Sequence, residues 1–257
     1  METSFPVMYG VPCWVGLMAR DLRAAQSFYS AVLGWTYRPT ELGPEFSVAL
    51  AGRRAAAGIG ALASSLQTAV AWTPYFSVAD ADTTAARVRE RGATVAVGPI
   101  AMHPGRATLA ADPDGAVFGF WEGRTVPGWS VGRGGAPARL ELRTRDAFAA
   151  AIFYAEVLTW GAQEAGSCEV RYENGSVLVR DATHTVAALH GGAVESAPDP
   201  QVRPRWRVYF RVADVDAAAG AAAEAGGVVV SAPAGPAAGR EATLRDPDGG
   251  LFAVTDG

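Results

Sequence analysis

The order of apolar and polar positions predicts short strands alternating with single helices. Residues 12–19 alternate weakly, as in a strand, and the apolar residues that follow recur at the spacing of one helix face. Asp21 is placed to cap this helix and Gly34 to end it. The further segments expected are strands near 44–50, 55–62 and 72–79, a helix at 81–91 ending at Gly92, and strands near 94–97, 106–111 and 116–121.

The same pattern occurs twice along the chain. ARDLRAAQSFYSAVLGW (19–35) matches TRDAFAAAIFYAEVLTW (144–160), and GRATLAADPDGAVFGF (105–120) matches GREATLRDPDGGLFAV (239–254). Such internal similarity in a fixed order predicts a tandem duplication. Each copy is itself two βαβββ half-units, so four are expected. We place the first domain at residues 1–124, a Gly- and Pro-rich linker at 125–137 and the second domain at 138–257.

Composition and charge narrow the possible partners. The 257 residues are 49% hydrophobic, which is ample for two packed domains, and the net charge is −4. No basic field is present to attract nucleic acid or an anionic membrane, so neither is expected as a partner. Two cysteines do not make a disulfide framework. The start, METSFPVMYGVP, lacks the basic and apolar regions of a secretory signal, so we expect a soluble, cytoplasmic protein.

The ordered motifs resemble those of the glyoxalase/bleomycin-resistance/dioxygenase superfamily, also called the vicinal oxygen chelate (VOC) superfamily. They are D-L-x-A-x-x-F-Y-x-x-V-L-G-W, V-x-D-x-D and G-R…D-P-D-G-A-V-F, and they cover nearly the whole chain twice. P-C-W-V near the start resembles a two-domain actinobacterial subgroup described loosely as hydroxylases. The resemblance implies an α+β fold in which paired βαβββ modules form two open, cup-like barrels, with the ligand or metal inside each cup.

The positions at which the family's metal enzymes hold their ligands carry other residues here. Counting along the family's motifs leads to Trp14, Thr73 and Gly119 in the first copy, and to Arg139, Arg207 and Ala253 in the second. Trp, Gly and Ala offer no suitable lone pair, and Arg is a permanent cation that repels a metal ion. We therefore expect no metal and no other cofactor.

A relocated metal site stays open as an alternative. The chain has three histidines. His184 and His190 lie six residues apart, so they share one face of a strand only if that strand runs unbroken through both. His103 precedes Pro104 and is expected in a loop. A two-histidine site would need a carboxylate from Glu122, Glu141 or Glu195. The simpler interpretation is that these are ordinary surface or hydrogen-bonded imidazoles.

Strand alternation predicts which side chains line the two cups. The first cup is expected to be aromatic and partly glycine-lined, so that glycines leave volume beside flat stacking surfaces. Its expected ligand-binding residues are Trp14, Gly16, Met18, Tyr75, Gly119 and Trp121. The alternative is that these aromatic side chains belong to an ordinary core.

The second cup is expected to be polar. Glu141, flanked by Arg139 and Arg207, forms either a structural ion network or a general base whose pKa is set by burial and by the two cations. Tyr75 and Tyr209 are the candidate acid–base partners of Glu141. Arg106 follows Gly105 at the start of a strand and is a candidate anchor for an anionic group, although Arg240 repeats it in the second copy, which favours a role in the fold.

Two classes of function remain. The first is a metal-independent protein that binds a planar, partly apolar small molecule, in specialised (antibiotic) metabolism or in self-resistance by sequestration. The second is a metal-free enzyme, a cyclase, isomerase or hydroxylase-type protein, acting on an aromatic or polyketide-like substrate. A metal-dependent glyoxalase or dioxygenase is disfavoured. If the two copies pair within one chain, the protein is a monomer with an internal pseudo-dimer, and a homodimer is also possible.

Overall fold

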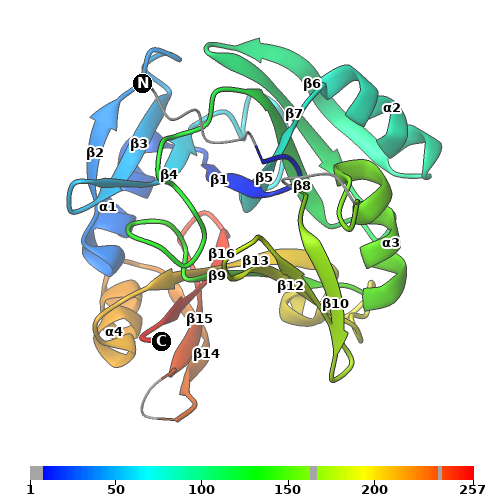
Figure 1. Cartoon of the computed structure of the whole chain (residues 1–257). Coiled ribbons are helices and arrows are strands. Elements are labelled where there is room, and N and C mark those ends of the chain that lie inside the picture. The colour runs from blue at the N-terminus through cyan, green and yellow to red at the C-terminus, as the bar shows by residue number, and fades with distance from the viewer. Residues whose placement is uncertain (1–7, 163–166, 237–238) are drawn as a thin grey trace. The chain divides into compact units, whose positions relative to one another are not determined.

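The computed structural model describes residues 8–162, 167–236 and 239–257. Residues 1–7, which belong to the segment expected to lack a secretory signal, lie outside the described residues. Along the chain one strand, one helix and three strands follow each other four times (Figure 1). The prediction of an α+β chain built from four βαβββ modules is confirmed. None of the described helices is long and apolar enough to cross a membrane.

The first sequence half contains two of these modules. The first module consists of β1 (Pro12–Met18), α1 (Leu22–Leu33), β2 (Thr36–Pro39), β3 (Phe46–Ala51) and β4 (Arg54–Gly60). The second consists of β5 (Ala71–Val78), α2 (Ala81–Glu90), β6 (Thr94–Met102), β7 (Gly105–Ala111) and β8 (Val117–Gly123). Strand β2 was not located from the sequence, because its four residues are mostly exposed and show no apolar alternation.

The second half repeats this order. The third module consists of β9 (Arg139–Arg143), α3 (Ala147–Leu158), β10 (Glu169–Glu173), β11 (Ser176–Arg180) and β12 (Thr185–His190). A short 3-10 helix (Pro200–Val202) precedes the fourth module, which consists of β13 (Arg205–Arg211), α4 (Val215–Glu224), β14 (Val228–Ala234), β15 (Glu241–Arg245) and β16 (Leu251–Thr255).

The strands form two eight-stranded mixed sheets that stay open. The first sheet contains the four-strand blocks β2-β3-β4-β1 and β5-β8-β7-β6, and the second contains β10-β11-β12-β9 and β13-β16-β15-β14. In every block the first strand of a module pairs in parallel with the last, as in Gly16 with Gly58 and Tyr75 with Gly119. The other pairs are antiparallel, as between β7 and β8.

Aspartates begin all four described helices. The Asp21 carboxylate accepts a hydrogen bond from the Ala24 amide, as predicted, and Asp146 does the same for Phe148 and Ala149. Helix α1 ends at Gly34 in the left-handed region, with φ of 65°. Helix α3 ends in the same conformation at Thr159, with φ of 60°, although a β-branched residue is strained there.

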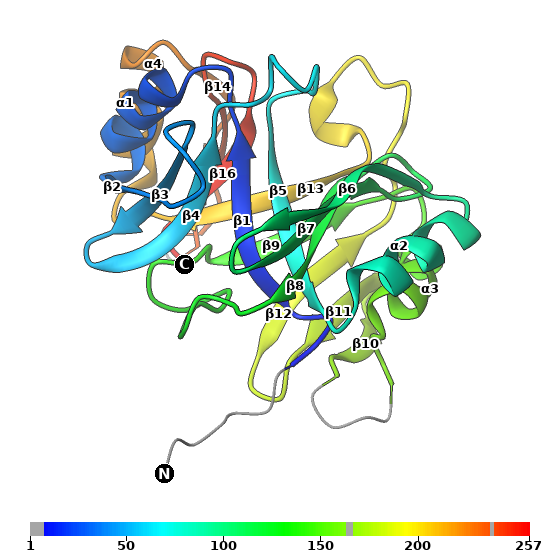
Figure 2. The ribbon, with the colours of Figure 1, turned by 90° about the horizontal axis from the view of Figure 1, so that it is seen from above.

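Contacts divide the chain into two compact units, each of which combines modules from both sequence halves. Unit 1 contains residues 1–13, 75–125 and 141–206, and unit 2 contains residues 14–74, 126–140 and 207–257. Helices α2 and α3 lie side by side in unit 1, and α1 and α4 lie side by side in unit 2 (Figures 1 and 2).

Candidate functional site

Each unit contains a buried hydrogen-bond chain built from the repeated motifs. In unit 2, the Trp72 indole N–H donates to the Tyr29 hydroxyl at 2.9 Å, and this hydroxyl donates to Asp246 at 2.8 Å. In unit 1, Trp206 donates to Tyr154 at 2.9 Å, and Tyr154 donates to Asp112 at 3.0 Å. Each of these hydrogen-bond chains joins the F-Y motif of one sequence half to the D-P-D-G motif of the other. These two motifs therefore connect the halves within each unit.

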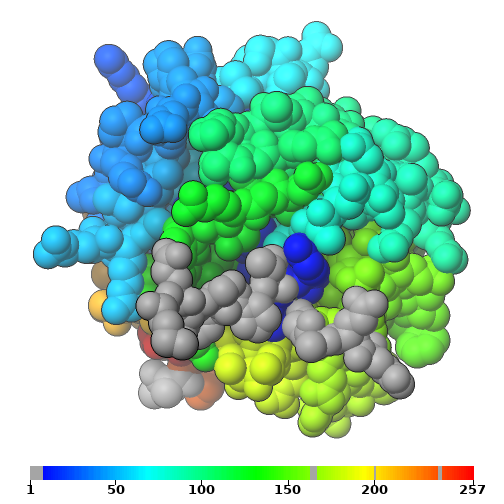
Figure 3. Space-filling model, turned by 45° about the horizontal axis from the view of Figure 1, so that its top comes forward, coloured from blue at the N-terminus to red at the C-terminus, as the bar shows by residue number. Residues whose placement is uncertain are grey.

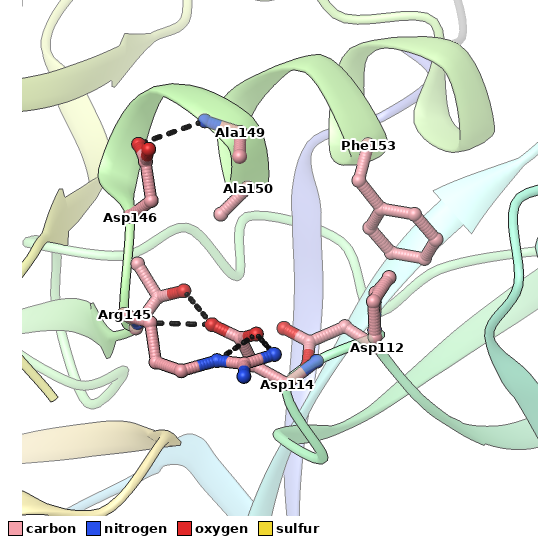
Figure 4. Close-up of a pocket in the computed structure, with 9 residues that line it drawn as sticks. Asp112, Asp114, Arg145, Asp146, Ala149, Ala150 and Phe153 are labelled. Atoms are coloured by element: carbon pink, nitrogen blue, oxygen red, sulfur yellow. Dashed lines mark hydrogen bonds and ion pairs between the residues drawn. The ribbon is translucent and has the colours of Figure 1, made fainter. Parts of the chain in front are cut away.

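The cavity in Figure 4 lies against one of these connections. It measures about 240 Å³ and lies in unit 1 at the D-P-D-G turn and the start of α3. The Asp114 carboxylate beside it accepts hydrogen bonds from the Thr144 hydroxyl at 2.7 Å and from Arg145 Nε at 2.6 Å. Burial raises the pKa of Asp112 to about 6. The lining residues are Asp112, Pro113, Asp114, Thr144, Arg145, Asp146, Ala149, Ala150 and Phe153.

Sequence comparison of the halves argues against a ligand in this cavity. Each lining residue except Thr144 is repeated at the corresponding position of the other half, for example Arg145 as Arg20 and Asp114 as Asp248. Arg20 Nη1 donates to the Asp248 carbonyl at 3.0 Å, so the second set of residues makes a similar contact in unit 2. Residues that make the same contact between the two halves in both units are explained by the needs of the fold.

The candidate cup residues of the first strand share one face of β1, as alternation predicted. The side chains of Trp14, Gly16 and Met18 are partly exposed, whereas Cys13, Val15 and Leu17 between them are buried. The two faces of β1 therefore differ as expected of a strand with one side in the core.

Trp14 lies over a glycine and beside a second tryptophan in unit 2. A Cβ atom added to Gly58 would come within 2.8 Å of Trp14 Nε1, so the indole occupies that space. The Trp129 ring centroid is 5.7 Å from that of Trp14. Phe46 covers Gly60 in the same way, with the Met18 sulfur nearby. We call Trp14, Met18, Phe46 and Trp129 the Trp14 site.

Trp129 comes from the segment expected to be a linker. Its indole N–H donates to the Ala56 carbonyl of β4 at 2.9 Å, and Val131 is 1% exposed. Gly135 lies so close to the β4 backbone that an added Cβ would meet the Arg54 carbonyl at 3.0 Å. This segment is therefore packed against β4 and contributes Trp129 to the Trp14 site. The tryptophan within this Gly- and Pro-rich stretch was a sequence signal that the segment packs against a domain, and the sequence analysis did not use it.

Glycines in unit 1 do not leave the volume that the sequence analysis expected. A Cβ on Gly119 would overlap the ring of Tyr75, its partner across the strands, and a Cβ on Gly105 would overlap Trp121. The absence of a side chain at these glycines therefore lets aromatic rings pack directly on the strand backbone. The Trp121 indole N–H donates to the Arg124 carbonyl at 3.1 Å. Burial raises the pKa of Tyr75 to about 12, so its hydroxyl stays protonated at neutral pH.

In unit 2, two arginines stack on one tyrosine. The guanidinium carbon of Arg139 lies 3.9 Å from the Tyr209 ring centroid, and that of Arg207 lies 5.0 Å from it. Arg139 forms an ion pair with Glu241 of β15, and Arg207 donates to the Thr243 hydroxyl at 3.3 Å. Tyr209 itself is 1% exposed. Glu241 is a carboxylate partner that the sequence analysis, which considered Glu141, did not identify.

Glu141 and Arg106, the other candidates, lie in unit 1. Glu141 is a partly exposed residue of β9 between the buried Leu140 and Leu142. The Arg106 guanidinium donates to Asp82 at 2.7 Å and to Glu122 at 3.3 Å. Arg240 donates in the same way to Asp216 of α4 at 3.0 Å. This repeated bridge to the first turn of a helix favours a structural role for Arg106.

The residues present do not fit the family's metal. Gly119 has the Tyr75 ring directly above it, and the Arg139 guanidinium is held between Glu241 and Tyr209. The described part of the chain has no group of three or more His, Cys, Asp or Glu side chains that could hold a metal ion.

Two of the three histidines, His184 and His190, have a hydroxyl as hydrogen-bond partner. His190 Nδ1 is 2.8 Å from the Ser176 hydroxyl, and His184 Nδ1 is 2.7 Å from that of Thr183. His184 precedes β12 and His190 ends it, so no unbroken strand runs through both. His103 lies in the turn between β6 and β7, as predicted.

Comparison with known proteins defines the class to which this fold belongs. The glyoxalase-like domain family matches residues 14–121 and again residues 139–255. The chain therefore belongs to the glyoxalase-like, or VOC, superfamily, with two such domains in tandem.

Curated relatives cover almost the whole chain. "Putative glyoxylase CFP32" of Mycobacterium tuberculosis is 33% identical over 95% of this chain and 94% of its own length. "Anthracycline biosynthesis protein DauV" of Streptomyces sp. (strain C5) is 30% identical over 96% of this chain and 93% of its own length.

Solved structures share the fold at low sequence identity. The Mn(II)-bound glyoxalase from Novosphingobium aromaticivorans is 17% identical with a TM-score of 0.58, covering 96% of this chain and 82% of that one. An extradiol ring-cleaving dioxygenase from B. fuscum is also 17% identical, with a TM-score of 0.59, covering 99% of this chain and 74% of that one. At such identity the likeness establishes the fold alone.

Proposed function

We propose that the chain binds a planar, partly apolar small molecule at the Trp14 site without using a metal ion. The observation that carries the proposal is the pair of partly exposed indoles, Trp14 and Trp129, whose ring centroids are 5.7 Å apart. Within the described residues, the Trp14 indole N–H has no hydrogen-bond partner. The two rings are tilted by 48°, so a fused-ring compound that carries oxygen substituents can stack on one indole and meet the edge of the other.

The names of two relatives support a class of ligand. DauV and DnrV, each 30% identical to this chain, are named as anthracycline biosynthesis proteins. Anthracyclines are planar, polycyclic and oxygenated, which matches the surface offered by Trp14 and Trp129. We therefore propose an aromatic polyketide as the ligand, bound either as an intermediate of specialised metabolism or in self-resistance by sequestration.

Tryptophan fluorescence and calorimetry with a tetracyclic anthracycline test this proposal. We expect saturable binding that chelator treatment leaves unchanged, and about tenfold weaker binding for Trp14→Ala and for Trp129→Ala because each removes a stacking surface. Tyr172→Ala removes an aromatic ring that is 65% exposed outside the site, and serves as the matched control. Binding that the two Trp variants leave intact, or that disappears with chelator, would refute the proposal.

A metal-free enzyme is the second candidate. Its support is Tyr75, which burial keeps protonated and whose hydroxyl has no hydrogen-bond partner among the described residues. Such a hydroxyl donates a hydrogen bond to a substrate oxygen, and Glu141 is the candidate base. Turnover of an aromatic polyketide that Tyr75→Phe and Glu141→Gln abolish would favour this function. Stoichiometric binding with no product would favour sequestration.

A further inference from the structure

Part of the second sheet carries polar side chains on the face that lies away from α3 in unit 1. Helix α3 packs against β11 and β12. The side chains that these strands and β9 turn toward the core are at most 1% exposed: Val177, Leu189 and Leu142. Ser176, His190 and Arg143 alternate with them and are partly exposed, so they lie on the opposite face. In the space-filling view, yellow-green and yellow atoms of the residue range that contains β11 and β12 are at the surface (Figure 3).

These three residues form one row across three neighbouring strands, which we call the Arg143 row. The register pairs Ser176 of β11 with His190 of β12, and His190 with Arg143 of β9. Neighbouring strands are about 4.8 Å apart, so the three side chains can reach one small chemical group. His190 Nδ1 is 2.8 Å from the Ser176 hydroxyl. When this hydroxyl donates to Nδ1, the neutral imidazole carries its proton on Nε2 and offers an N–H donor to a ligand.

The Arg143 guanidinium has no counter-charge in the part of the chain that the structure describes. It forms no ion pair there, and its Nε–H is buried without a hydrogen-bond partner. Other strand arginines are paired, for example Arg139 with Glu241. Glu141 lies two residues before Arg143 on the same face, but its partner in the register is Ala188, one row away. A buried guanidinium donor without an acceptor is unfavourable, so an anion bound here would stabilise the row.

The fold does not require a polar row at this place. The first half has the same register, in which Gly60 of β4 pairs with Phe46 and with Met18. Met18 and Arg143 each lie three residues before the aspartate that begins the next helix. In the first half this row is apolar, because the Phe46 ring covers Gly60 and the Met18 sulfur lies nearby. Packing of the strands therefore does not explain the arginine and the histidine of the second half.

We propose that Arg143, His190 and Ser176 form a second ligand site, which binds an oxyanion, the carboxylate or phosphate group of a small molecule. The guanidinium supplies the positive charge and two donors matched to two oxygens, and the imidazole supplies a further donor. The serine hydroxyl holds the imidazole in place. The Arg143 row lies in unit 1 and the Trp14 site lies in unit 2, so the inference does not depend on the proposed function.

Proton–carbon NMR of the histidine rings tests this proposal on the full chain. The chain has three histidines, and His190→Gln assigns the signal of His190. At constant pH and ionic strength, acetate or inorganic phosphate should shift that signal saturably, with a dissociation constant on the order of 1 mM. The signals of the other two histidines should stay in place. Tighter binding of acetate assigns a carboxylate ligand and tighter binding of phosphate assigns a phosphate ligand, and either result supports the site.

Variants separate the charge of Arg143 from the overall charge of the chain. Arg143→Met installs the residue type of the first half and should weaken binding at least about tenfold, with an unchanged circular dichroism spectrum. The matched control, Arg89→Met, removes the same charge from an exposed position of α2 and should bind like the wild type. Ser176→Ala keeps every charge but releases the imidazole, and should weaken binding about threefold. This variant decides the question if Arg143→Met does not fold.

Three results would overturn the proposal. The first is a His190 signal that neither anion shifts saturably, or that sodium chloride shifts as much. The second is binding that Arg143→Met and Ser176→Ala leave unchanged. The third is an equal loss of binding in Arg89→Met and Arg143→Met, which would show that only the net charge of the chain matters.

Discussion

Removing one hydroxyl from the buried chain in unit 1 should destabilise the protein by a predictable amount. The Tyr154 hydroxyl accepts from Trp206 and donates to Asp112, and burial and the Asp112 charge raise the pKa of Tyr154 well above its usual value. Tyr154→Phe keeps the ring that stacks on Trp160 but leaves a buried indole N–H and a buried carboxylate oxygen each short of one partner.

The expected loss follows from the two orphaned groups. A buried donor or acceptor without a partner costs about 1–3 kcal/mol, with charged groups at the upper end. The phenyl ring fills the same space, so no cavity cost is added. The free energy of unfolding of Tyr154→Phe should therefore fall by about 3 kcal/mol at pH 8. Tyr29→Phe, which breaks the matching chain to Asp246 in unit 2, should lose a similar amount.

The loss should depend on pH with a definite sign. The pKa of Asp112 is raised by burial to about 6 in the folded protein, above its unfolded value near 4, and the Tyr154 hydrogen bond works against this rise. The wild-type contribution of this carboxyl to stability is therefore greatest at low pH and is lost as pH rises from about 4 through 6. Without Tyr154 the ionised form becomes still less favourable. The difference between variant and wild type should accordingly be larger at pH 8 than at pH 5.

Urea unfolding followed by circular dichroism at pH 5 and pH 8 measures both quantities. Tyr172→Phe alters an exposed hydroxyl and should change the free energy of unfolding by less than about 0.5 kcal/mol. A change of less than about 0.5 kcal/mol for Tyr154→Phe at pH 8, or an equal loss at both pH values, would contradict the role given to the Tyr154 hydroxyl.

Three further predictions concern single positions. Gly119→Ala should lower the free energy of unfolding by roughly 2 kcal/mol in urea titrations, because the new methyl group overlaps the Tyr75 ring; an unchanged value would contradict that packing. Thr159→Gly should raise the melting temperature, since it removes a left-handed β-branched residue worth roughly 1 kcal/mol of strain, and a lower value would contradict this. Burial raises the pKa of Cys13 and of Cys168 to about 12, so a disulfide reagent at pH 8 should label them only after urea unfolding; rapid labelling of the folded chain would refute this.

The fold could be predicted because its signals are local and occur twice. The Asp21 cap, the apolar spacing of α1 and the D-P-D-G turns each depend on nearby residues, and repetition of the motifs showed where the modules begin. The edge strand β2 has no such signal. The pairing of Tyr29 with Asp246 is 217 residues apart in sequence, so no periodicity could have joined them.

The candidate site was predicted only in part, because its faces follow alternation but its packing does not. Alternation placed Trp14 on the partly exposed face of β1. It did not show that the Tyr75 ring fills the space above Gly119, or that Trp129 lies beside Trp14. Both depend on which side chain of a neighbouring segment turns toward the glycine or the indole. The Arg139–Glu241 ion pair joins residues 102 apart and lacks a local signal in the same way.

Duplication provides a way to separate structural from functional positions in this chain. The two buried hydrogen-bond chains use the same residue types in both halves, because each unit needs the same contact between the halves. They are Tyr29 with Asp246 and Tyr154 with Asp112. Positions that differ between the halves are free of that requirement. Trp14 corresponds to an arginine in the second half, and the outer faces of α1 and α3 differ in the same manner. The structural requirement shared by the two halves explains neither difference, so such positions, Trp14 among them, are the ones at which a function should be tested first.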